Sequence, residues 1–142
     1  MLTREDIAYV AGLLDALSRV RIFSTPEGTD LPRIAVSTPE MELLTYLGSL
    51  TGTAPFITKR TYDRHRCTQH CEQAHQHVVS KSGRWSVSGA KATILGSAVL
   101  PHIRLQKTDF EVAVAVGLIA PKKLATPKKM QALGWPLPEE WK

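Results

Sequence analysis

Apolar residues recur along the first segment of the chain at the spacing of an α-helix. Thr3 and Asp6 have the spacing of a capping box, with Asp in place of the usual Glu or Gln, and they predict that a helix begins at about Arg4. This helix is expected to span residues 4–17 and to bury one apolar stripe. The stripe consists of Ile7, Val10, Leu14 and Leu17.

The next two segments alternate between polar and apolar residues, which is typical of strands with one face in water. Residues 19–23 alternate Arg19 and Arg21 with apolar side chains. Residues 33–37 place Arg33 on the face opposite their Ile and Val residues. Proline, glycine and acidic residues between the two segments predict a loop.

A second helix is expected after these strands. Thr38 is expected to cap it, with Pro39 and Glu40 at its first positions, and Gly52 is expected to end it. Its buried stripe consists of Met41, Leu43, Leu44 and Leu47.

The second half of the chain predicts two further strands and two further helices. The strands cover residues 56–62 and 84–88, and the helices cover residues 90–99 and 108–119. Strands that come in pairs between helices favour an α+β fold with a four-stranded antiparallel sheet. We therefore expect one domain over residues 1–120 and a Pro- and Lys-rich tail over residues 121–142 that wraps the surface or frays.

Composition adds a basic character to this fold. The 142 residues carry a formal net charge of +5, and residues 57–91 alone hold seven Lys and Arg against two acidic residues. A small basic domain favours polyanionic partners, nucleic acid first. No apolar run approaches the length of a membrane span, and the acidic N-terminus is unlike a signal peptide, so a cytoplasmic location is expected.

Several motifs resemble one known family. The first helix contains the segment Val-Ala-Gly-Leu-Leu-Asp-Ala over residues 10–16. The second half contains a strand with Trp85, a helix, a Pro-aromatic-aliphatic turn that starts at Pro101, and Lys107. Together these features resemble the LAGLIDADG homing endonucleases over about residues 4–119, and the expected order α-β-β-α-β-β-α is also that of the family.

The resemblance implies a homodimer that lays a saddle-shaped sheet in the major groove of a nearly palindromic duplex DNA. With one motif per chain, the small-residue face of the first helix is expected to pack against its copy in the partner. The expected interface residues are Ala8, Ala11, Gly12 and Asp15. The basic residues expected to contact DNA are Arg19, Arg21, Arg33, Lys59, Arg60, Arg64 and Arg84.

The eighth motif position departs from the family. There the family has the acidic residue that holds the divalent metal beside the scissile phosphates, and this chain has Leu17. Leucine offers no oxygen to Mg²⁺ and would extend the apolar stripe. Asp15 lies about 200° around the helix from Leu17, and Lys107 is one position past the expected basic residue. We expect a DNA-binding protein with impaired or absent cleavage; the alternative is an active, Mg²⁺-dependent endonuclease that uses Asp15 and Lys107.

A cluster of histidine and cysteine residues occupies residues 65–77 of the chain. Two cysteines and two histidines can close a tetrahedral structural zinc site. The expected ligands are Cys67, Cys71, His75 and His77, with His70 as the alternate fourth ligand and His65 a weaker one. Histidines that contact phosphates, or a reduced cysteine pair buried for packing, are the alternatives. The third hypothesis for the whole chain is a protein-interaction module stabilised by a structural zinc ion. Proteins of the homing type are frequent in phages and mobile elements.

Overall fold

A computed structural model describes residues 2–63, 77–120 and 128–142. Its helices are α1 (Arg4–Leu17), α2 (Met41–Thr51), α3 (Ala90–Val99), η1 (Leu100–His102), α4 (Lys107–Ile119), α5 (Lys128–Ala132) and η2 (Glu139–Trp141). Its strands are β1 (Ser18–Ser24), β2 (Asp30–Thr38), β3 (Phe56–Asp63) and β4 (His77–Ser88). The four strands form one antiparallel sheet in the order β1-β2-β4-β3, which confirms the predicted α+β class.

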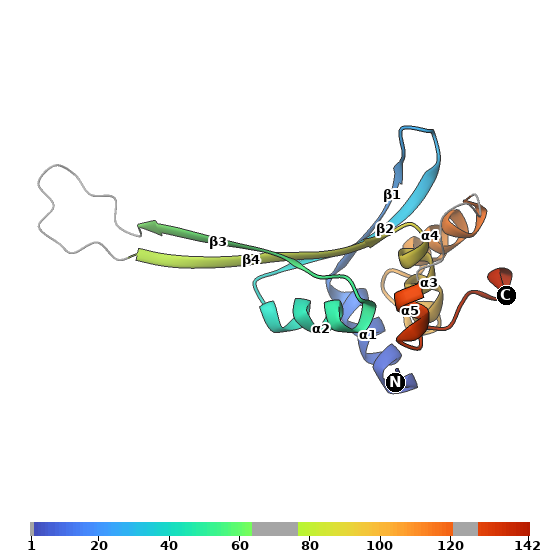
Figure 1. Cartoon of the computed structure of the whole chain (residues 1–142), viewed down its shortest axis with the longest axis horizontal. Coiled ribbons are helices and arrows are strands. Elements are labelled where there is room, and N and C mark those ends of the chain that lie inside the picture. Colours follow the sequence, from blue (N-terminus) through green and yellow to red (C-terminus); the bar gives the residue numbers. More distant parts are fainter. Residues whose placement is uncertain (1, 64–76, 121–127) are drawn as a thin grey trace, which may run out of the picture.

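The helices gather along one side of the sheet, and the β3–β4 hairpin extends away from them (Figure 1). The core lies between the helices and the apolar face of β2 and β4. The strand residues in it are Ile34, Val36, Trp85 and Val87. Among the described residues, no helix is long and apolar enough to cross a membrane.

Helix α1 begins as the sequence predicts. The backbone N–H of Asp6 donates to the Thr3 hydroxyl at 3.1 Å, and the N–H of Thr3 donates to the Asp6 carboxylate at 2.9 Å. These contacts hold the pKa of Asp6 below its ordinary value. The predicted stripe is wrong at its last position, because Leu17 is 46% exposed at the point where the chain turns from α1 into β1. Ala11 is fully buried in the core beside α1's apolar residues.

Helix α2 starts two residues later than predicted and without the predicted cap. Thr38 is the last residue of β2, so the N-cap position falls to Glu40, whose side chain makes no capping hydrogen bond. The Thr38 hydroxyl accepts the N–H of Glu40 at 3.2 Å instead. Gly52 ends the helix at φ +69°, a left-handed conformation that favours glycine, as predicted.

The C-terminal segment joins the core. Met130 of α5 is fully buried, and Trp135 is 3% exposed. The indole N–H of Trp135 donates to the carbonyl of Leu50 in α2 at 2.7 Å. The described part of the expected tail, residues 128–142, therefore closes the core beside α2 rather than only wrapping the surface.

Candidate nucleic-acid interface

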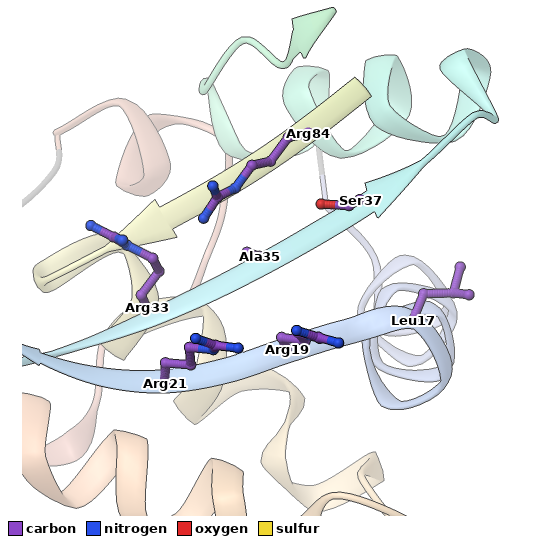
Figure 2. Close-up of a pocket in the computed structure, with 7 residues that line it drawn as sticks. All are labelled: Leu17, Arg19, Arg21, Arg33, Ala35, Ser37 and Arg84. Atoms are coloured by element: carbon purple, nitrogen blue, oxygen red, sulfur yellow. The ribbon is translucent and has the colours of Figure 1, made fainter. Parts of the chain in front are cut away.

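Four arginines converge on the face of the sheet that the helices leave open (Figure 2). They surround a hollow of about 500 Å³, which we call the arginine groove. The groove is lined by Leu17, Arg19, Arg21, Arg33, Ala35, Ser37 and Arg84. All four arginines belong to the set that the sequence predicts as DNA contacts.

The strand register explains why these side chains meet. Successive residues of a strand point to opposite faces, so the residues that alternate with the core positions share the open face. Arg21 lies opposite Arg33 on the neighbouring strand, and Ser37 of β2 lies opposite Arg84 of β4. Arg19 lies opposite Ala35, so a small side chain sits at the centre of the groove.

The groove concentrates positive charge without internal neutralisation. Among residues 2–58, 82–120 and 128–142, whose side chains the structure describes, the only ion pair joins Lys142 to Glu139, so no carboxylate there pairs with the groove's guanidinium groups. Like charges directly opposite each other on two strands are unfavourable, and Arg21 and Arg33 form such a pair. The Arg33 guanidinium carbon lies 4.4 Å from the centre of the Phe23 ring, a cation–π contact. A bound anion would relieve the repulsion between these side chains.

Leu17 forms one end of the groove, where the family resemblance would place a metal-binding carboxylate. The lining of the groove contains no acidic side chain, so the residues present there do not fit a Mg²⁺ site. An apolar, half-exposed leucine leaves this end of the groove uncharged.

Asp15 is engaged elsewhere. Its carboxylate accepts the backbone N–H groups of Arg104 at 2.9 Å, Leu105 at 3.0 Å and Gln106 at 2.8 Å. These donors, led by Leu105, hold the pKa of Asp15 below its ordinary value, and the Arg104 charge adds to the effect. Asp15 therefore anchors the turn before α4.

Gln106 makes hydrogen bonds in the opposite direction, from the start of α4 to the end of α1. The sequence did not single it out as a contact. Its side-chain amide donates to the carbonyl oxygens of Leu14 at 3.3 Å, Asp15 at 3.0 Å and Ser18 at 2.9 Å. Of these acceptors, the Asp15 carbonyl lies in the last turn of α1, where carbonyls lack helical partners. Lys107, the candidate basic catalytic residue, is the exposed first residue of α4.

The remaining predicted residues are distributed as follows. Ala8 and Gly12 are exposed on α1, whereas Ala11 belongs to the chain's own core. Lys59 and Arg60 lie in β3 opposite Lys81 and Ser80 of β4.

The predicted zinc ligands fall largely outside the described residues. This applies to Cys67, His70, Cys71 and His75, to His65, and to the predicted DNA contact Arg64. His77 is the first residue of β4 and pairs with Asp63 in the register.

The fold and the groove define the chain as an α+β domain whose antiparallel sheet has helices on one face and a basic groove on the other. Comparison with protein-family models and with curated proteins found no match to this chain.

Proposed function

We propose that this protein binds duplex DNA sequence-specifically through the arginine groove, as a homodimer of LAGLIDADG type, and that it cleaves DNA poorly or not at all. The observation that carries the proposal is the convergence of four arginines from three adjacent strands around a hollow with no carboxylate in its lining. Arginine serves both phosphate contacts and readout of guanine, so such a surface suits duplex DNA.

The size of the sheet supports binding in the major groove. Adjacent strands lie about 4.8 Å apart, so β1, β2 and β4 together span about 10 Å. The major groove of B-DNA is about 12 Å wide and admits strands of a sheet. The open face also has a floor of small side chains, which lets the edges of base pairs approach it.

The exposed face of α1 supports the homodimer. A Cβ atom added at Gly12 would meet nothing within 4 Å beyond the backbone of its own helix, and Ala8 is exposed beside it. Small residues on a helix allow a second backbone to come close. Two copies related by a two-fold axis would extend the basic face over two half-sites, which predicts a nearly palindromic target.

The loss of cleavage rests on the chemistry at the end of the groove. Cleavage with Mg²⁺ needs a carboxylate beside the scissile phosphate, and Leu17 supplies none. Asp15 cannot replace it without giving up the three N–H groups that it holds.

Selection of bound sequences from a random duplex library, followed by a binding and cleavage assay on the selected duplex, tests the proposal. We expect affinity to fall steeply as salt rises, because phosphate contacts release counterions. Arg19→Ala should weaken binding and reduce the salt dependence by about one counterion. Arg4→Ala, which removes an exposed charge at the start of α1, is the matched control.

Two results would count against the proposal. Equal losses for Arg19→Ala and Arg4→Ala would mean that the groove is not the DNA-binding surface. Efficient double-strand cleavage with Mg²⁺ or Mn²⁺ that Asp15→Asn abolishes would favour the active endonuclease instead.

A further inference from the structure

Arg33 differs from the other three arginines of the groove. It is half-buried, whereas Arg19, Arg21 and Arg84 are exposed. It lies on β2, which has β1 on one side and β4 on the other. It also makes the groove's one aromatic contact within the described residues, with its guanidinium carbon 4.4 Å from the centre of the Phe23 ring.

This environment preorganises the Arg33 side chain. An arginine loses rotamer freedom when it binds, and a long exposed side chain loses most of it at that moment. The ring of Phe23 and the half-buried position restrict Arg33 before any ligand arrives. A guanidinium held in place presents two parallel N–H groups to one planar acceptor, whereas a lysine ammonium lacks this rigid planar fork.

The surroundings of Arg33 leave room for a base edge. Its cross-strand neighbour on β4 is Ser88, and the next open-face residue along β2 is Ala35, whose own neighbour on β4 is Ser86. These short side chains leave open space beside the guanidinium of Arg33. The exposed arginines around them have the freedom to follow a phosphate backbone.

We propose that Arg33 recognises one guanine in each half-site. Its guanidinium donates hydrogen bonds to the O6 and N7 atoms of that base in the major groove. The exposed Arg84 contacts phosphate and sets affinity without selecting a base. This assignment rests on the proposed DNA binding. The bidentate pair of arginine with guanine O6 and N7 is the commonest specific contact in the major groove.

The positions of Arg33 and Arg84 make the assignment separable by experiment. Arg84 lies opposite Ser37, which is four residues beyond Arg33 on β2, or about 13 Å along the strand. At about 3.4 Å per base pair, this separation corresponds to about four base-pair steps. A change at Arg33 should therefore act on a different part of the half-site than a change at Arg84.

The test compares motifs selected from random duplex DNA by the wild-type chain, Arg33→Ala, Arg33→Lys, Phe23→Leu and Arg84→Ala. For Arg33→Ala, we expect one guanine per half-site to become degenerate, with about a 5- to 150-fold loss of discrimination there, and for Arg33→Lys a smaller loss at the same position. Arg33→Lys should keep the salt dependence of the wild type, because it keeps the charge. Phe23→Leu should relax the same position in part, since it frees Arg33 without changing the charge. Arg84→Ala should weaken binding to all sequences alike.

Different results would overturn the assignment of Arg33 and the proposed binding of DNA. An unchanged motif for Arg33→Ala, in a wild type that selects a clear motif, would overturn the assignment of Arg33 alone. Relaxation of a base by Arg84→Ala with none by Arg33→Ala would overturn it as well. A wild-type chain that retains no duplex DNA would overturn the proposed function and this assignment with it.

Discussion

At the scale of single residues, Asp15 and Gln106 exchange hydrogen bonds across the junction of α1, β1 and α4. Asp15 accepts three backbone N–H groups before α4, and Gln106 donates to three carbonyls around the end of α1. Ser18, one of those acceptors, directly precedes Arg19 of the groove. The exchange therefore positions the start of the groove against the helical layer.

Replacing Asp15 with Asn tests this anchor. An amide has one acceptor oxygen and no charge, so we expect a lower melting temperature, by several degrees. The stabilisation is expected to depend on pH, because the folded state lowers the pKa of Asp15 below its unfolded value of about 3.9. It should be fully present above that unfolded value and lost as pH falls through the lower folded pKa.

Thermal unfolding between pH 2 and 7 measures the effect. The wild type should lose its advantage over Asp15→Asn in strong acid. Asp109→Asn removes an exposed carboxylate in the first turn of α4 and serves as the control. A constant difference between wild type and Asp15→Asn across this range would contradict the role given to the carboxylate.

Leu17 allows a second residue-scale prediction. Its side chain is 46% exposed, so Leu17→Asp should fold, and it places a carboxylate at the end of the groove. That carboxylate should repel DNA phosphates, so we expect weaker DNA binding in EDTA and recovery when Ca²⁺ or Mg²⁺ bridges the two groups. Leu17→Asn, similar in size and uncharged, should bind DNA independently of the cation. Equal behaviour of the two variants would place Leu17 away from bound phosphate.

At the scale of elements, strong local patterns predicted the structure best. α3 was predicted with its observed ends, and α1 and α2 ended where expected. β4 was predicted only over its last five residues, because the polar and small residues before Arg84 lack an apolar alternation. The burial of Met130 and Trp135 depends on α2, which lies far away in the sequence, so a proline-rich pattern gave no sign of it.

In the candidate site, too, local patterns were predicted from the sequence and long-range contacts were not. Alternation along β1 and β2 was enough to place Arg19, Arg21 and Arg33 on one face. The hydrogen bond from Gln106 to Asp15 joins residues that are 91 positions apart. The distance from Arg33 to Phe23 depends on the twist and register of a hairpin. Neither contact leaves a local signal in the sequence.

At the scale of elements, we predict that two copies of the chain pack through the exposed face of α1. Gly12 is exposed and has open space at the position of a Cβ atom, so Gly12→Leu should leave the monomer folded while it blocks close packing of a second α1. We expect sedimentation to show a shift from dimer to monomer and DNA binding to lose its preference for palindromic sites. Ala115→Leu, on the exposed side of α4, is the control. A Gly12→Leu protein that stays dimeric would move the interface away from α1.

At the scale of the whole molecule, the hydrophobic core lies away from the far end of the β3–β4 hairpin. The core lies under the helices and includes Trp85, Trp135 and Phe110. The segment 57–91, which carries the excess of basic residues, includes the β3–β4 hairpin that extends away from this core (Figure 1). Changes at the far part of this hairpin should therefore alter DNA binding more than folding.

The predicted zinc site lies in the segment between β3 and β4 and tests this separation. We expect one zinc per chain by elemental analysis of protein purified without added metal, and a marked loss of zinc in Cys67→Ser and His75→Ala. His102→Ala, an exposed histidine in η1 outside the cluster, should keep its zinc. Because Trp85 lies near the end of β4 that joins the core and Trp135 lies in the C-terminal segment, chelation should leave the near-ultraviolet circular dichroism of the core largely unchanged while DNA affinity falls. Unfolding of the core on chelation would show that the metal holds more of the molecule than the hairpin. Zinc-free wild-type protein would leave phosphate contact or packing as the role of the cluster.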